Sequence, residues 1–183
     1  SWLSVLEASF VAFTLQPYHR NFGKRVTKQP KLYFYDTGLV CALLGFRTAE
    51  QLATHYLRGS IFESYVVSEY LKRCHHAGHR PNAWFWRDNH GHEIDLILED
   101  GQTLYAIEVK AGETLQEDLF REVAWFRKVT GQPDDRCFLV HGGTRSQAPR
   151  PRAPAGAPAA GGPAAPVACG QECPAPRAAT QTD

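Results

Sequence analysis

The stretch at residues 91–112, GHEIDLILEDGQTLYAIEVKAG, decides the fold of this chain because it has the pattern of a β-hairpin. Runs 92–99 and 103–110 are rich in Ile, Leu, Val and Tyr, and Asp100-Gly101 between them is a strong signal for a tight turn. The sequence therefore predicts two antiparallel strands joined by a tight turn.

Pairing the two strands across that turn predicts Asp95 opposite Ala106, and Glu93 opposite Glu108. Side chains alternate between the two faces of a strand, so one face should carry three acids and a lysine. These residues are Glu93, Asp95, Glu108 and Lys110. The other face should be entirely apolar or aromatic, with Ile94, Leu96, Leu98, Tyr105, Ile107 and Val109.

Carboxylates held close together have a chemical consequence. They repel one another, and one of them gains a proton unless a cation lies between them. Mg²⁺ or Mn²⁺ bound by the carboxylate oxygens removes this repulsion. Such an ion can also activate a water molecule to attack a phosphodiester. A nearby ammonium such as that of Lys110 can stabilise the negative charge that develops in the reaction. The alternative is a surface ladder of ion pairs in which Lys110 only neutralises its neighbours.

Asp95 followed by Glu108-Val109-Lys110 resembles the D…(D/E)-x-K core of the PD-(D/E)XK nuclease superfamily, although Ile94 stands where that pattern has Pro. The expected order over residues 60–141 is helix, three strands, helix and strand, which is the αβββαβ, restriction-endonuclease-like α/β core of that superfamily. Four segments look more narrowly like the C-terminal domain of unknown function attached to predicted prokaryotic AAA+ ATPases: KLYFYDTGL, GSIFESYVVSEYLK, FWRDNHGHEIDLILE and AIEVKAG.

The resemblance implies a nuclease-like domain that hydrolyses DNA with Mg²⁺ or Mn²⁺ as its cofactor. Asp95, Glu108 and Lys110 would be the catalytic residues, and Asp95, Glu108 and Glu63 would hold the metal. The alternatives are a non-catalytic module of the same fold that recognises DNA or a protein for an ATPase, and a truncated remnant.

Two further residues have supporting roles in this prediction. Glu93 would lie beside the metal ligands, or would itself be a ligand if the hairpin contains a bulge. Arg87, at the end of the expected strand FWR, could contact a phosphate, but an ion pair with one of the acids is favoured.

Glu63 has two interpretations. Ser60 and Glu63 have the spacing of a capping box at the start of a helix. Alternatively, Glu63 shares one helix face with Val66, Val67 and Tyr70, so that its carboxylate points at the sheet and completes the metal site.

Charge along the chain is nearly balanced, at 20 Lys+Arg against 19 Asp+Glu, so the basic excess typical of nucleic-acid-binding proteins is missing. One segment is nevertheless basic and contains no acid. Its residues predicted to bind nucleic acid are Arg20, Lys24, Arg25, Lys28 and Lys31. The alternative is an ordinary solvated loop.

Three parts are expected along the chain. Residues 1–47 resemble the end of a winged-helix module, with a buried helix over 2–15 and two strands at 16–21 and 31–35, followed by a helix that Asp36 caps. Residues 48–145 should form the nuclease-like domain, which includes a second helix that starts with a capping box at Thr114. Residues 146–183, rich in Ala, Pro and Gly, should be a disordered tail.

Several expectations concern partners and location. No Walker A pattern occurs, so no ATPase activity is expected and the AAA+ partner should lie on another polypeptide. No secretory signal or apolar span is present, which favours a cytoplasmic protein without a membrane partner. The absence of methionine favours a fragment or a truncated gene product, and the Ala, Pro, Gly and Arg of the tail favour a frame-shifted C-terminus. Zinc binding at the Cys74-His75-His76 stretch is disfavoured, because its spacing matches no usual zinc pattern.

Overall fold

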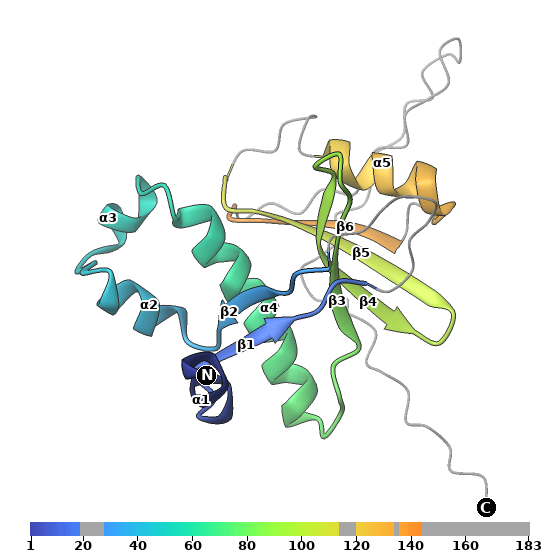
Figure 1. The fold of residues 1–183 in the computed structure, drawn as a ribbon. Helices are drawn as coiled ribbons and strands as arrows, with labels where there is room; N and C mark the ends of the chain where they lie inside the picture. The colour runs from blue at the N-terminus through green and yellow to red at the C-terminus, as the bar shows by residue number, and fades with distance from the viewer. Residues whose placement is uncertain (19–27, 114–119, 134–135, 144–183) are drawn as a thin grey trace, which may run out of the picture. The chain divides into compact units, whose positions relative to one another are not determined.

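The computed structural model describes residues 1–18, 28–113, 120–133 and 136–143, and every structural statement below refers to these ranges. A four-stranded sheet of order β3-β4-β5-β6 lies at its centre (Figure 1). The strands are β3 Ala83–Arg87, β4 Glu93–Asp100, β5 Thr103–Lys110 and β6 Cys137–His141. The first three pair antiparallel, and β6 joins β5 in parallel.

Two helices complete the predicted order of helix, three strands, helix and strand. Helix α4 spans Arg58–His76 and precedes the sheet, and helix α5, Arg121–Thr130, lies between β5 and β6 in the chain. The order of elements is therefore confirmed. The predicted disordered tail and the capping box at Thr114 fall outside the described residues.

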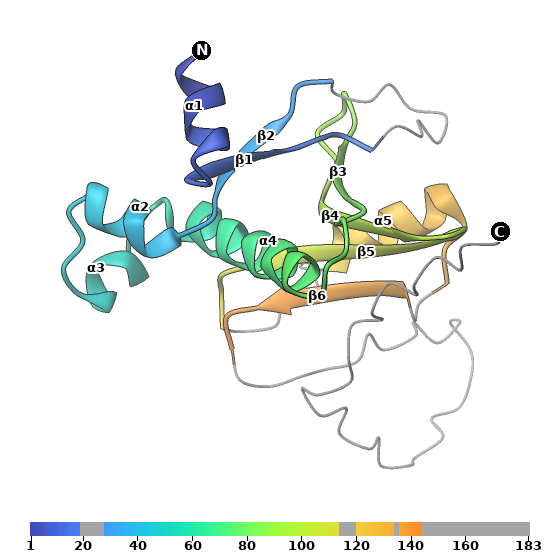
Figure 2. The ribbon, with the colours of Figure 1, turned by 90° about the horizontal axis from the view of Figure 1, so that it is seen from below.

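The two helices pack on opposite faces of the sheet, as Figures 1 and 2 show, and each face has its own apolar core. Helix α4 buries Val67 and Leu71, and helix α5 buries Val123 and Phe126. The strand residues in the α4-side core are Phe85, Leu96, Leu98, Ile107 and Val109. Those in the α5-side core are Trp86, Ile94, Ile97, Leu104, Ala106 and Cys137. Each fully buried aliphatic or aromatic side chain contributes about 1.5–3 kcal/mol to stability.

The register of the hairpin differs from the prediction by two residues. Asp100 pairs with Thr103 and Ile97 pairs with Ala106, so Ala106 does not lie opposite Asp95. The physical reason is the turn, in which Gly101 adopts a left-handed φ of 61° and is the first of the two loop residues rather than the second.

A β-bulge in β4 changes which residues share a face. The register between β3 and β4 shifts, because Trp84 pairs with Ile97 whereas Trp86 pairs with Ile94. Ile94 and Ile97 consequently both pack in the α5-side core, although they are three residues apart, and Asp95 lies between them in the bulge. The predicted apolar face is therefore wrong at Ile94.

The predicted single acidic face is wrong for the same reason. Glu108 follows the alternation of Ala106 and lies on the α5 side of the sheet, where the charge of Glu122 reaches it. Glu93 instead lies on the α4 side, where it meets Lys31. A regular hairpin would have kept the acids on one face, and the bulge divides them.

The N-terminal part contains helix α1, Trp2–Ala8, followed by an antiparallel pair of strands, β1 Ala12–Leu15 and β2 Lys31–Phe34. The predicted buried helix over 2–15 is wrong, because α1 has no buried residue and β1 occupies the second half of that segment. Phe10 breaks the helix with a left-handed φ of 57°. The predicted strand at 16–21 is wrong at its described residues 16–18, because β1 ends at Leu15, and residues 19–21 lie outside the described ranges. The second strand agrees with its predicted position.

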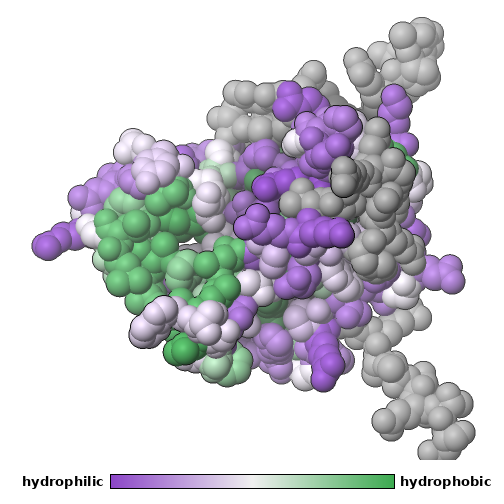
Figure 3. All heavy atoms as spheres, viewed as in Figure 1, coloured by the Kyte–Doolittle hydropathy of each residue, from purple (hydrophilic) through white to green (hydrophobic). Residues whose placement is uncertain are grey.

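Two short helices, α2 Thr37–Leu43 and α3 Ala49–Ala53, lead to α4. Asp36 caps α2 as predicted, since its Oδ1 accepts hydrogen bonds from the backbone N–H of Gly38 and Leu39. Apolar surface gathers over α2 and α3 in Figure 3, whereas the centre of that face is hydrophilic. In the part of the chain described here, no helix combines the length and apolar character that a membrane span requires.

Candidate active site

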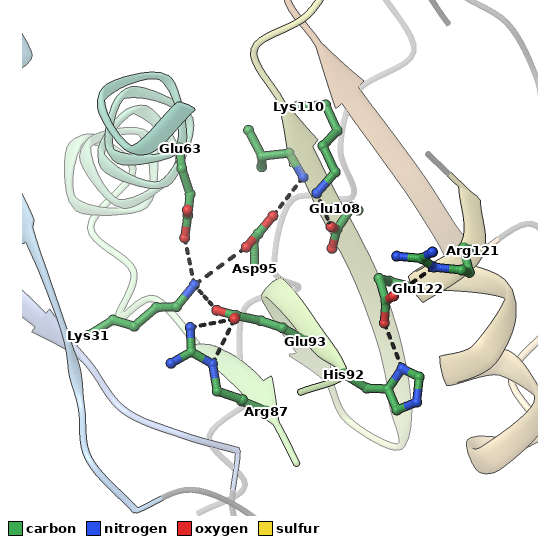
Figure 4. Close-up of polar contacts among 11 residues, drawn as sticks. Lys31, Glu63, Arg87, His92, Glu93, Asp95, Glu108, Lys110, Arg121 and Glu122 are labelled. Carbon is green, nitrogen blue, oxygen red and sulfur yellow. Dashed lines mark hydrogen bonds and ion pairs between the residues drawn. The ribbon is translucent and has the colours of Figure 1, made fainter. Parts of the chain in front are cut away.

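Three carboxylates converge where helix α4 meets the start of β4. Glu63 comes from α4, and Glu93 and Asp95 come from β4 on either side of Ile94 (Figure 4). One oxygen of each lies within 4.8 Å of the others. Within the described ranges this is the only group of three or more His, Cys, Asp or Glu residues placed in this way. These three residues are called the carboxylate cluster below.

A cleft of about 440 Å³ opens onto the carboxylate cluster. It is lined by β2, by the first turns of α2 and α4, and by the adjoining ends of β3 and β4, where Arg87 and Glu93 lie. Glu108 and Lys110 are not among the described residues that line it. The cluster is therefore reached from the side of the sheet that α4 covers.

The ammonium of Lys31 lies inside the carboxylate cluster. Its Nζ is 2.7 Å from Glu63 Oε1 and 3.4 Å from Asp95 Oδ1, and it also contacts Glu93 Oε1. Only 17% of the Lys31 side chain is exposed, and the ring centroid of Phe85 lies 5.4 Å from Nζ. The sequence predicts that Lys31 binds nucleic acid, and in the structure its charge is directed at the acids, so this role stays a prediction.

The structure describes only one of the other basic residues that the sequence predicts to bind nucleic acid. Lys28 is exposed just before β2, as a nucleic-acid contact would require. Arg20, Lys24 and Arg25 lie outside the described residues, so their predicted role stays a prediction.

The Glu63 carboxylate points at the sheet, as the second of the two interpretations of its sequence position predicts. Helix α4 begins at Arg58 with Leu57 as N-cap, and no side chain caps it, so the predicted capping box at Ser60 is wrong. The Glu63 carboxylate instead accepts a hydrogen bond of 2.6 Å from the hydroxyl of Tyr33. Burial, followed by the negative charge of Glu63, raises the pKa of the Tyr33 phenol, which therefore remains a donor.

Glu93 is held from two sides. Arg87 Nε donates to Glu93 Oε2 at 2.6 Å, so the predicted ion pair of Arg87 with an acid is present. Lys31 contacts the other oxygen of the same carboxylate. The sequence predicts a ligand role for Glu93 if the hairpin contains a bulge, and β4 does contain one.

Asp95 is 7% exposed and bridges the carboxylate cluster and strand β5. Its Oδ2 accepts a hydrogen bond of 2.9 Å from the backbone N–H of Val109, while Oδ1 faces Lys31. Burial, and next the charge of Glu63, raises the pKa of Asp95 to about 6, even though Lys31 and the Val109 N–H act in the opposite direction.

Glu108 lies beside Asp95 but outside the carboxylate cluster, and Glu93 takes the place that the sequence assigned to Glu108. Glu108 is 3% exposed, and the ammonium of Lys110 contacts its Oε1. Its Oε2 is buried and has no hydrogen-bond partner among the residues that the structure describes. Burial, and next the charge of Asp95, raises the pKa of Glu108 to about 7.

A histidine–glutamate pair lies on the α5 side of Glu108 and was not predicted. His92 Nδ1 is 2.9 Å from Glu122 Oε2 (Figure 4). The His92 ring also stacks on Trp125 with 4.0 Å between centroids. The charge of Glu122 adds to the rise in the pKa of Glu108. No spacing in the sequence marks this pair, because His92 and Glu122 are 30 residues apart.

The sequence did not predict that Lys31 and Tyr33 contact Glu63, although it contains a weak indication of it. They alternate on β2 and so share one face of that strand, which is the face that meets Glu63. The alternation alone gives no partner, since Glu63 is 32 residues from Lys31. Only the packing of β2 on α4 brings them together.

Comparison with known proteins gives matches at the level of families. The model of the family described as "Domain of unknown function (DUF4143)" matches residues 58–152, and that of a second domain of unknown function, DUF8612, matches residues 1–50. The first match contains Glu63, Glu93, Asp95 and Glu108, and the second contains Lys31.

Two curated mycobacterial proteins are similar to part of the chain. They are the uncharacterized protein Mb2031c of Mycobacterium bovis and the uncharacterized protein Rv2008c of Mycobacterium tuberculosis. Each is 32% identical over 114 residues, which is 62% of this chain and 25% of the relative. The chain thus spans about a quarter of the length of these relatives. No solved structure matches it significantly.

Proposed function

The chain belongs to the DUF4143 family, and on that premise we propose that its acidic site binds a divalent metal ion and hydrolyses phosphodiesters in DNA. The observation that carries the proposal is the convergence of Glu63, Glu93 and Asp95 on one cleft, with Glu108 and Lys110 next to Asp95 on the neighbouring strand. The resemblance of these residues to the D…(D/E)-x-K pattern, and of the element order to a restriction-endonuclease-like core, supports the same chemistry.

The donor set fits Mg²⁺ or Mn²⁺. Every candidate ligand in the cluster is a carboxylate oxygen, which is what these hard cations prefer. The Oε2 atom of Glu108 is buried without a hydrogen-bond partner among the described residues. Burial, and next the charge of a neighbouring acid, raises the pKa of both Asp95 and Glu108, and a bound cation would offset both effects. Glu63, Glu93 and Asp95 would hold the ion, with Glu108 adjacent.

A bound Mg²⁺ would polarise a phosphoryl oxygen and lower the pKa of a water molecule. The residues of the chain would position the metal ligands and neutralise negative charge on the phosphate. Tyr33 orients Glu63, and the Val109 N–H orients Asp95. The ammonium of Lys110 would stabilise the charge that develops on the phosphate. In the reaction the water oxygen bonds to phosphorus, the bond from phosphorus to the sugar oxygen breaks, and the departing oxygen takes up a proton.

The proposal also concerns the partner and the neighbouring module of this domain. The resemblance implies that such a domain works beside an AAA+ ATPase and that residues 1–47 are the end of a winged-helix module. The antiparallel pair of β1 and β2, joined by the basic segment, supports the second point.

The test is nicking of supercoiled plasmid by the purified chain with Mg²⁺, Mn²⁺ or EDTA. Asp95→Asn and Lys110→Met should abolish metal-dependent nicking. Matched controls are Asp100→Asn, an exposed acid at the turn end of β4, and Lys72→Met, which removes an exposed lysine paired with Glu69 on α4; both should retain it. A folded wild-type chain that nicks no DNA with either metal would refute the proposed hydrolysis.

One observation favours a second candidate, a non-catalytic module that recognises DNA. The ammonium of Lys31 already contacts all three carboxylates of the cluster, as a structural ion pair would. Fluorescence anisotropy with a labelled duplex in EDTA tests this function. Binding that survives Asp95→Asn, together with equal background nicking in all variants, would favour recognition, whereas no binding would exclude it.

A further inference from the structure

We propose that Lys31 is a built-in competitor of the metal ion, whose ammonium must leave the carboxylate cluster before a divalent cation can bind there. This inference rests on the metal site of the proposed function and adds its regulation. It concerns a residue of the N-terminal strand pair, whereas the acids belong to α4 and β4.

The competition follows from shared atoms. Lys31 Nζ contacts Glu63 Oε1, Glu93 Oε1 and Asp95 Oδ1, one oxygen from each carboxylate. A hard divalent cation binds carboxylate oxygens at about 2.0–2.6 Å, so it would need the same space between them. An ammonium and a divalent ion a few ångströms apart also repel strongly at a site shielded from water. The two cations therefore exclude one another.

The position of Lys31 allows it to leave. The lysine ammonium is a compact charge on a flexible four-carbon stem, so it can turn while its backbone stays in β2. Lys31 lines the cleft together with the three acids, which gives the side chain room to rotate away from them. Tyr33, two residues further on the same strand, would keep its own contact with Glu63 and hold that carboxylate in place.

The arrangement differs from an ordinary surface ion pair. Lys72 pairs with Glu69 on the outside of α4, where the two side chains are 36% and 49% exposed. The Lys31 side chain is 17% exposed and meets three acids from two elements. Removing its charge should thus change the affinity of the cluster for cations, whereas removing that of Lys72 should not.

The first test is Mn²⁺ binding to the full chain, measured by electron paramagnetic resonance of free Mn²⁺. Lys31→Met should bind Mn²⁺ about tenfold more tightly than wild type or better, because the competing charge is gone. Lys31→Arg, which keeps the charge, and Lys72→Met should not bind more tightly than wild type. Equal or weaker binding by Lys31→Met would overturn the inference.

The second test uses the wild-type chain and so does not depend on the folding of a variant. Acetic anhydride should modify Lys31 slowly, because its ammonium is ion-paired, and addition of Mg²⁺ should increase that rate severalfold while the rate at Lys72 stays unchanged. Mass spectrometry of peptides gives both rates. Saturating Mg²⁺ that leaves the Lys31 rate unchanged would overturn the inference.

The outcomes separate this inference from the proposed function. Tighter Mn²⁺ binding by Lys31→Met without any plasmid nicking would support the competition and count against hydrolysis. Metal-dependent nicking with equal Mn²⁺ affinities would support hydrolysis and refute the competition. A chain that binds no Mn²⁺ with either Lys31 or Met at this position would refute both.

Discussion

The Oδ2 atom of Asp95 accepts a hydrogen bond from the backbone N–H of Val109, which ties the bulge of β4 to the strand that carries Glu108. This contact fixes the side chain of Asp95 but does not compensate for its burial, since the pKa of Asp95 still rises to about 6. Glu108 has a pKa of about 7 for the same main reason. In the absence of metal, the folded chain therefore carries a cost that depends on pH.

We expect the free energy of unfolding in EDTA to include a contribution from Asp95 and Glu108 that falls as pH rises from about 4 to about 7. In this window the folded chain keeps protons that the unfolded chain has released at the ordinary pKa values of 3.8 and 4.5, so the folded state binds more protons and loses stability with rising pH. The loss should be on the order of 3 kcal/mol, which is the value for one group shifted by about two pKa units at about 1.4 kcal/mol per unit, because the interacting pair is treated as sharing one such shift. Guanidinium denaturation at several pH values measures it.

Variants isolate the contribution of Glu108 to the pH dependence of the free energy of unfolding. Glu108→Gln should reduce the loss of stability between pH 4.5 and pH 7.5 relative to wild type, whereas Asp100→Asn, an exposed acid on the same hairpin, should leave it unchanged. A Glu108→Gln chain whose stability varies with pH as in wild type would contradict the assignment.

Tyr33→Phe should lower the free energy of unfolding by about 1–2 kcal/mol, because it removes a buried donor to a charged acceptor and leaves Glu63 with one partner fewer. The ring of Tyr33 stays stacked on Phe13 in the variant, so the change isolates the hydroxyl. Denaturant unfolding at pH 7 measures the difference.

Tyr65→Phe is the matched control on helix α4. Tyr65 is 49% exposed, and its ring packs on Phe62, so the loss of its hydroxyl should change stability by less than about 0.5 kcal/mol. If the two variants lose equal stability, the Tyr33 hydroxyl has no special role in holding Glu63.

The sequence could predict the order of elements because each is encoded locally. The apolar runs of β4 and β5 and the turn at Gly101 define the hairpin, and Asp36 caps α2 where the sequence places it. Arg87 could be assigned to an acid because it lies only six residues from Glu93. These features depend on neighbours along the chain, which a sequence pattern contains.

The arrangement of the acids could not be predicted, because it depends on a bulge and on a distant strand. Strict alternation puts Glu93, Asp95 and Glu108 on one face, but one extra residue in β4 near Asp95 places Glu93 on the α4 side, while Asp95 stays beside Glu108. Lys31 is 64 residues from Asp95, and nothing in its basic surroundings indicates that it turns inward. Tertiary packing decides both.

Phe126→Ala should destabilise the chain by about 3–5 kcal/mol, because Phe126 is fully buried between α5 and the sheet and its removal leaves a cavity. Phe138→Ala on β6, where the side chain is 44% exposed, should cost about 1 kcal/mol or less. Thermal unfolding of both variants tests whether α5 forms a core with the sheet. Equal, small losses would show that α5 does not pack there.

Ser60→Ala distinguishes the observed start of α4 from the capping box that the sequence suggests. Ser60 lies inside the first turn, with no side-chain cap hydrogen bond at the N-cap residue Leu57, so Ala should change the free energy of unfolding by no more than about 0.5 kcal/mol. Asp36→Ala is the matched comparison, because Asp36 is an N-cap with two hydrogen bonds, and its loss should cost about 1 kcal/mol. Denaturant unfolding of both variants measures the contrast. A loss at Ser60 as large as that at Asp36 would mean that Ser60 caps the helix, and Glu63 would then be bound to the helix terminus rather than directed at Lys31 and Tyr33.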